Sequence, residues 1–172
     1  LRAIAPSGAG RTLVTLDGVP LNDPFGGWVI WSQVPTESLS GLDVVRGAGA
    51  GPYGAGALTG VIALRERDGT GGALELSGSE LGGQRLGAAT TLSAGRFSLT
   101  GALQREVSDG YVPVRGPAAG AVDTPLDLET LSGALRLDAA LAGEVALSLR
   151  ASAYDEERGS GLLGARSSAS GE

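Results

Sequence analysis

Polar and apolar residues alternate along the chain from residue 72 onward. In 85–94 and 97–105, leucine, alanine and phenylalanine share one side, opposite arginine, serine, threonine and glutamine. The same period of two recurs in 130–139 and 145–154, and 73–79 makes a fifth segment. Because successive side chains of a β-strand point to opposite faces, each segment predicts a strand with one apolar and one polar face.

Short and long connections separate these predicted strands. Ala94-Gly95-Arg96 and Ala142-Gly143 are tight hairpin turns. By contrast, 106–129 is long and rich in proline, glycine and aspartate, and 155–172 is polar. Alternating short and long connections are typical of outer-membrane barrels, which have short periplasmic turns and long external loops. On that topology, the two long segments face outside the cell.

The composition of the two faces favours a membrane barrel. The apolar faces carry no charge over several strands, as a lipid-facing surface requires, and the opposite faces suit a watery lumen. Aromatic residues for the membrane interfaces are few, namely Phe97, Tyr111 and Tyr154. Alternating strands also build soluble sandwiches, in which one face packs on a second sheet. The strands alone leave both architectures open.

Short strands and glycine-rich turns make up the first third of the chain. An apolar strand over 11–16 enters a sharp turn, and a second strand over 42–46 ends in Val-Val-Arg-Gly. Glycine-dense residues 47–60 lead to a third strand over 61–64. Between the first two strands, Pro35 to Leu39 predicts a single helical turn, with proline near its start and an acidic residue in its first turn.

An aromatic loop follows the first strand and is the best candidate binding surface. Asn22-Asp23-Pro24 is a turn signal, and Gly26-Gly27 gives the loop a glycine hinge. Flat rings supply contact area, and indole N–H groups supply directed hydrogen-bond donors. The alternative is that one or both tryptophans pack inside the protein. Five residues form this candidate binding surface: Asn22, Asp23, Phe25, Trp28 and Trp31.

Composition narrows the function classes. The 172 residues include 30 glycines and have a net charge of −6, with thirteen scattered arginines, which argues against a nucleic-acid partner. Without histidine or cysteine, neither a Ser/His triad nor a transition-metal site is expected, so we predict no enzyme, no metal and no cofactor. Gly49 to Gly54 fits G-x-G-x-x-G, but a strand rather than a helix follows, which excludes a dinucleotide site.

The order of these features from Leu13 to Leu64 resembles the C-terminal half of the plug domain of TonB-dependent outer-membrane receptors. The resemblance covers about the first third of the chain. It implies a mainly β protein, with a plug-domain fragment over 1–67 (a small mixed sheet with a short helix). About five antiparallel strands of a transmembrane β-barrel follow over 68–172. The residues that carry the plug motif are Asp17, Gly18, Arg46, Gly47, Tyr53, Gly54 and Gly60.

The resemblance also implies a function. Such a receptor lies in the outer membrane among lipid, and it binds a scarce nutrient, such as a ferric siderophore or cobalamin, at its outer face. A TonB-type inner-membrane energy-coupling complex, acting through a segment that we expect outside this sequence, then drives plug movement and import. The resemblance further implies that the aromatic loop faces the extracellular side and contacts the substrate there through Asn22, Asp23, Phe25, Trp28 and Trp31. It also implies that Glu37 and Arg46 form ion pairs with the barrel interior; the alternative for Arg46 is that it only tethers the plug fold. The alternative is a soluble or secreted glycine-rich β-sandwich or adhesin that binds a partner without transport.

Overall fold

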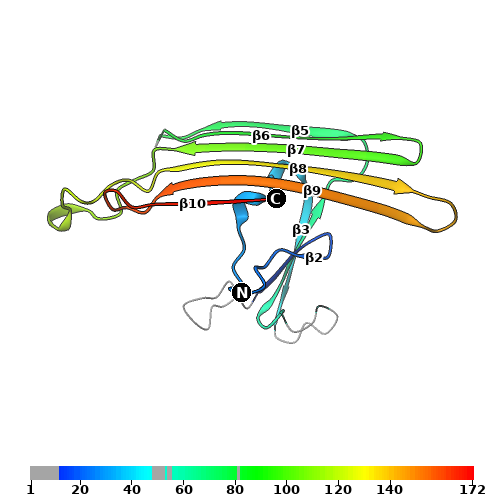
Figure 1. Cartoon of the computed structure of the whole chain (residues 1–172), viewed down its shortest axis with the longest axis horizontal. Coiled ribbons are helices and arrows are strands. Elements are labelled where there is room, and N and C mark those ends of the chain that lie inside the picture. Colours follow the sequence, from blue (N-terminus) through cyan, green and yellow to red (C-terminus); the bar gives the residue numbers. More distant parts are fainter. Residues whose placement is uncertain (1–11, 48–52, 54–55, 81) are drawn as a thin grey trace. The chain divides into compact units, whose positions relative to one another are not determined.

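The computed structural model describes residues 12–47, 53, 56–80 and 82–172, and it divides the chain into two compact units. The first unit comprises residues 1–31 and 39–68, and the second comprises residues 32–38 and 69–172. Each unit is built on one sheet (Figure 1). Among the described residues, no helix has the length and apolar content needed to cross a membrane.

The first unit is a small mixed sheet with the strand order β2-β1-β4-β3. Its strands are β1 (Thr12–Leu16), β2 (Val19–Pro20), β3 (Leu39–Arg46) and β4 (Gly60–Glu66). β1 runs parallel to β4, and the other two pairings are antiparallel. Asp17 and Gly18 connect β1 to β2 with φ angles of 48° and 85°, the positive pair that a type I′ hairpin turn requires. Leu13, Ala57 and Val61 pack together in a buried cluster, and Val14, Leu16 and Leu64 are buried as well.

The second unit is an antiparallel sheet of six strands in which neighbours along the chain are neighbours in space. Figure 1 shows these long strands lying side by side. The strands are β5 (Gly71–Gly78), β6 (Gln84–Ala94), β7 (Phe97–Ser108), β8 (Leu128–Ala140), β9 (Ala146–Gly159) and β10 (Arg166–Gly171).

The register of this sheet gathers the apolar residues on one face. One cross-strand row consists of Leu92, Leu99, Leu137 and Leu149. The next row, on the opposite face, consists of Thr91, Thr100, Arg136 and Arg150. A shift of the strand register by one residue would move every side chain of a strand to the other face. The alternation of apolar and polar residues therefore determines the register.

The apolar face is exposed, and much of the polar face of β6, β7 and β8 is buried, whereas a sheet in a soluble protein buries its apolar face. The exposed apolar residues include Leu74, Leu76, Leu92, Phe97, Leu99, Leu103, Leu131, Leu135 and Leu149. The buried polar residues of the opposite face are Thr91, Thr100, Gln104, Thr130, Ser132 and Glu156. An exposed apolar surface of this extent marks an interaction surface.

The predicted fold class is confirmed, with corrections at the end of the chain. The structure has six strands in this sheet rather than about five, and residues 155–159 and 166–171, predicted as part of a polar loop, are strands. β9 continues to Gly159 and β10 adds a strand of serine, alanine and glycine. Charges on both faces of β9 and small residues in β10 hide the alternation there. The predicted helical turn is the 3₁₀ turn η3 (Thr36–Ser38), and two further 3₁₀ turns are η2 (Trp31–Gln33) and η5 (Gly116–Ala118).

Candidate functional site

Asn22 links the aromatic loop to β1 through hydrogen bonds of its side chain. Its side-chain Oδ1 accepts a hydrogen bond from the backbone N–H of Val14 at 2.8 Å. Its Nδ2 donates to the carbonyl oxygens of Thr12 and Gly27, each at 3.0 Å. All these bonds fix the path of the loop, so Asn22 acts on the loop's shape.

Asp23 plays a similar part inside the loop. Its Oδ1 accepts hydrogen bonds from the N–H groups of Phe25, at 2.9 Å, and Gly26, at 2.6 Å. Its own N–H donates to the carbonyl of Trp28 at 2.7 Å. A short polar side chain that binds nearby backbone in this way is a common device of tight turns. These bonds hold the turn of the loop in one conformation.

The three aromatic residues of this segment are exposed. Phe25 is 97% exposed, and Trp28 and Trp31 are 53% and 54% exposed. The Trp28 ring lies so close over Gly26 that a Cβ at this position would overlap the ring. Glycine at position 26 therefore lets the indole pack against the backbone of the loop. Phe25 and Trp28 come from one loop of the first unit, whereas Trp31 starts η2 at the end of that unit's first segment.

Five of the predicted plug-motif residues lie at the two ends of the first sheet, namely Asp17, Gly18, Arg46, Gly47 and Gly60. Asp17 and Gly18 form the hairpin turn, and the Asp17 Oδ1 accepts the N–H of Glu66 at 3.1 Å. At the other end Arg46 pairs with Gly60, and the Gly47 N–H donates to the Thr59 carbonyl at 3.2 Å. Tyr53 is partly exposed, and Gly54 lies outside the described residues.

Residues 32–38, here called the anchor segment, belong to the second unit although they stand between two parts of the first. Val34, Pro35, Glu37 and Ser38 are buried. Ser38 closes the turn, because its N–H and its hydroxyl both donate to the Pro35 carbonyl, at 3.0 and 2.7 Å. The turn η3 contacts β5, β6 and β7.

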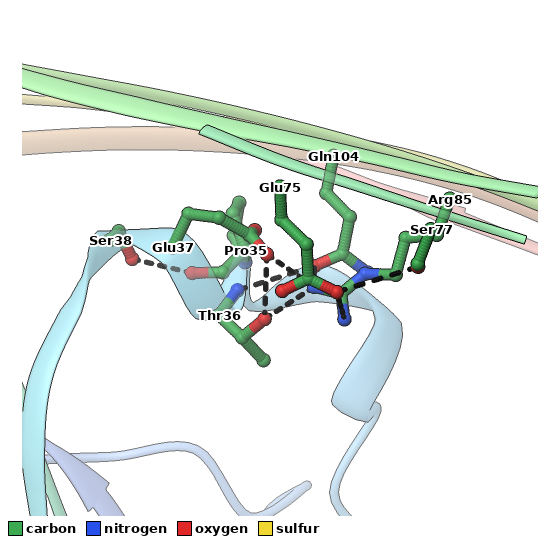
Figure 2. Close-up of polar contacts among 8 residues, drawn as sticks. All are labelled: Pro35, Thr36, Glu37, Ser38, Glu75, Ser77, Arg85 and Gln104. Atoms are coloured by element: carbon green, nitrogen blue, oxygen red, sulfur yellow. Dashed lines mark hydrogen bonds and ion pairs between the residues drawn. The ribbon is translucent and has the colours of Figure 1, made fainter. Parts of the chain in front are cut away.

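Arg85 of β6 is at the centre of a cluster of polar side chains and binds the anchor segment (Figure 2). Its Nη2 donates to Glu37 Oε1 at 2.6 Å and to Gln104 Oε1 at 3.1 Å, and it also reaches the Thr36 hydroxyl. Gln104 Oε1 accepts the Thr36 N–H at 3.2 Å as well. Glu75 adds a second carboxylate, 3.6 Å from Arg85 Nη1. The Glu37 side chain is 4% exposed and that of Arg85 is 22% exposed, so water screens the pair weakly.

Gly87 leaves the space that the Glu37 carboxylate occupies. A Cβ at Gly87 would overlap the carboxyl group of Glu37, so the carboxylate rests directly on the backbone of β6. Gly101, in β7, is different, since a Cβ there would meet only the Leu135 Cδ2 at 3.4 Å, an ordinary contact. Position 87 therefore requires glycine for space, and position 101 does not.

We expect Gly87→Ala to loosen the anchor segment, because the added methyl group displaces the Glu37 carboxylate from Arg85. Overpacking of this kind costs about 1–3 kcal/mol. Hydrogen exchange of residues 32–38 measures the loss as faster exchange in the folded protein. Gly101→Ala is the matched control and should change this exchange little. Equal exchange in the two variants would contradict the seating role of Gly87.

Sequence reasoning identified Glu37 but missed its partners. Arg85 and Gln104 stood in the sequence only as polar positions of alternating strands. Gly87 pairs with Gln104 across β6 and β7, and Arg85 precedes Gly87 by two residues, so all three lie on the face of the sheet that η3 contacts. The separation of 48 residues between Glu37 and Arg85 carries no local signal.

The long connection between β7 and β8 folds onto the turn between β9 and β10. Asp123 pairs with Leu162 in an isolated bridge, and the Leu163 N–H donates to the Val122 carbonyl at 2.8 Å. The Asp127 carboxylate accepts a hydrogen bond from Arg166 Nη1 at 2.9 Å. These contacts join two connections, both at the same end of the second sheet, into one ordered structure.

Comparison with known proteins gives a consistent result. Residues 3–61 match the family model of the TonB-dependent receptor plug domain. A search of curated proteins finds no match. The fold is similar to that of the ferric enterobactin receptor PfeA from Pseudomonas aeruginosa, with a TM-score of 0.67 and 17% identity over 92% of this chain. It is also similar to the siderophore receptor PirA from Acinetobacter baumannii, with a TM-score of 0.65 and 18% identity over 92% of the chain.

A third similar structure is the FrpB iron transporter from Neisseria meningitidis, with a TM-score of 0.61 and 16% identity over 87% of this chain. The chain spans about a quarter of each of these proteins, namely 26% of PfeA, 25% of PirA and 24% of FrpB. The similarity covers both sheets, because it extends well beyond the residues that match the plug domain.

Proposed function

We propose that this chain, which combines a TonB-dependent receptor plug segment with the antiparallel strands that follow it, works in an energy-coupled outer-membrane importer. The observation that carries the proposal is the reversed second sheet, with leucine side chains exposed on one face and threonine, serine and glutamine buried on the other. Lipid satisfies an exposed apolar face, and a polar interior suits the inside of a barrel. A soluble sandwich would instead bury the leucine face against a second sheet.

An iron chelate is the ligand class that we propose. The similar structures are named as a ferric enterobactin receptor, a siderophore receptor and an iron transporter. In this chain, Phe25 and Trp28 offer exposed rings on a loop that Asp23 holds in shape. Rings fixed in this way can stack on a flat aromatic chelator with little loss of conformational entropy.

The proposal includes the site of action and the energy source. The receptor lies in the outer membrane, with lipid on the leucine face of β5–β10. A TonB-type complex of the inner membrane supplies the energy that moves the plug. Marginal local stability suits a moving plug.

Uptake by intact cells tests this function. Cells that produce the full-length protein containing this chain should accumulate radiolabelled ferric enterobactin, and a protonophore should stop accumulation while leaving surface binding intact. Uptake of labelled cobalamin serves as the comparison ligand. Binding without accumulation, or accumulation that the protonophore leaves unchanged, would contradict an energy-coupled importer.

The double substitution Phe25→Ala with Trp28→Ala should weaken binding of ferric enterobactin about tenfold or more, because truncation of aromatic anchors at binding sites typically costs more than 1 kcal/mol. Leu58→Ala is the matched control, since Leu58 is an exposed apolar residue of the same unit outside the loop. A binding curve on whole cells measures both. Equal affinities for the two variants would remove the aromatic loop from the binding site.

A further inference from the structure

The chain passes from the first unit to the second and back again within a few residues. It leaves the first unit after Trp31, passes through the anchor segment of the second unit, and returns to the first unit at Leu39, where β3 starts. The first sheet is thus linked, on both sides of the anchor segment, to seven residues that group with the other sheet. Any motion of the first sheet must either detach these residues or leave them behind.

The contacts of the anchor segment are those of a fixed element. Glu37 is paired with Arg85 and seated on Gly87, the Thr36 N–H is bound by Gln104, and Ser38 closes the turn on Pro35. A carboxylate buried to this degree is costly to separate from its guanidinium. Within the second unit, these contacts make residues 32–38 a part of the wall formed by β5, β6 and β7.

The links on either side are less regular. Residues 27–30 have no regular secondary structure. On the other side, the register of β3 against β4 shifts between Leu39 and Gly41, directly after the anchor segment. Irregular positions at the ends of an element can absorb the backbone rotations of a hinge.

We propose that the anchor segment stays bound to β5–β7 during transport, while the sheet of the first unit moves about hinges at 27–31 and 39–41. This inference rests on the proposed function, because it describes the motion that import requires. Detaching the anchor segment would break the Arg85–Glu37 pair, whereas moving the first sheet alone breaks none of the contacts within the second unit. The anchor segment therefore acts as a tether that keeps the plug attached to the barrel wall.

Cysteine labelling tests the tether in cells that express the full-length protein and take up ferric enterobactin. This chain has no cysteine of its own. Val14→Cys probes the first sheet, Val34→Cys probes the anchor segment and Ala89→Cys probes β6, and all three positions are buried. Each variant is exposed to a small maleimide with ferric enterobactin, with and without a protonophore. Thr15→Cys and Ser38→Cys form a second pair, so that a variant that fails to fold can be replaced.

Energised transport should raise the labelling rate of Val14→Cys about tenfold or more, as local opening exposes it, and leave Val34→Cys as slow as Ala89→Cys. Val34→Cys reacting as fast as Val14→Cys would overturn the tether, because the segment would then leave with the plug. No change at any position during active uptake would also overturn it. Absence of uptake by the unmodified protein is a separate result, and it would contradict the proposed function itself.

Discussion

Replacing Arg85 with alanine is expected to release the anchor segment from the second sheet. The substitution removes the guanidinium that lies 2.6 Å from Glu37 and leaves that carboxylate, 4% exposed, without its partner on β6. Breaking a buried ion pair from one side costs about 3–5 kcal/mol, and the partial exposure of Arg85 favours the lower end of that range. Hydrogen exchange of residues 32–38 should accelerate about a hundredfold, the factor that corresponds to about 3 kcal/mol.

A matched control shows whether the faster exchange comes from the loss of Arg85 in particular or would follow the loss of another arginine of the sheet. Arg105 of β7 pairs with Glu129 at 2.9 Å, but both side chains are more than half exposed, at 58% and 60%. Such a pair contributes about 0–1 kcal/mol, so Arg105→Ala should leave the exchange of residues 32–38 unchanged. Adding Glu37→Gln to Arg85→Ala should recover part of the loss, because a neutral amide is easier to bury. Similar exchange in Arg85→Ala and Arg105→Ala would show that the ion pair does not hold the segment.

Placing a charge in the middle of the leucine face should prevent insertion into membranes. Leu135 lies between Gly101 and Ala151 in the cross-strand row at the centre of this face, and it is 58% exposed. An arginine at the midplane of a lipid-facing strand costs about 2–4 kcal/mol. The full-length protein carrying Leu135→Arg should therefore fold into lipid vesicles with lower yield, as measured by its gel mobility without heating.

Leu162→Arg is the control for the added charge, because Leu162 is about equally exposed but lies in the turn between β9 and β10. This variant should insert as well as the unchanged protein. Insertion of Leu135→Arg with the same yield as Leu162→Arg would show that the leucine face does not meet lipid. In a soluble sandwich, where this face packs on a second sheet, Leu135→Arg would instead lower the stability of the protein in water. That result would favour the sandwich architecture.

The second sheet was largely predictable because its signal is local. Alternation in 85–94, 97–105, 130–139 and 145–154 fixes which side chains share a face, and tight turns at Gly95 and Gly143 fix the pairing of neighbours. The prediction was wrong at the end of the chain, where apolar and polar residues no longer alternate. In β9, Asp155, Glu156 and Glu157 place charges on both faces, and the small residues of β10 show no apolar side.

The candidate site was less predictable, because its contacts join distant parts of the chain. Asn22 and Asp23 stood out as polar residues beside aromatic ones. The Asn22 side chain is hydrogen-bonded to the backbone of β1 and of the loop, and the Asp23 side chain is hydrogen-bonded to the backbone of the loop. Arg85 and Gly87 looked like ordinary strand positions. Only the packing of η3 on β6 shows that one supplies the charge for Glu37 and the other supplies the space.

The central claim is that the leucine face of β5–β10 meets lipid and that the opposite face does not. A nitroxide scan along β8, from Leu131 to Ala139, in the full-length protein inserted into vesicles tests it most directly. The account predicts a period of two, with positions 131, 133, 135, 137 and 139 accessible to oxygen dissolved in the lipid and the alternate positions protected from it. Access of a water-soluble relaxation agent to the leucine positions, or no alternation at all, would contradict the account.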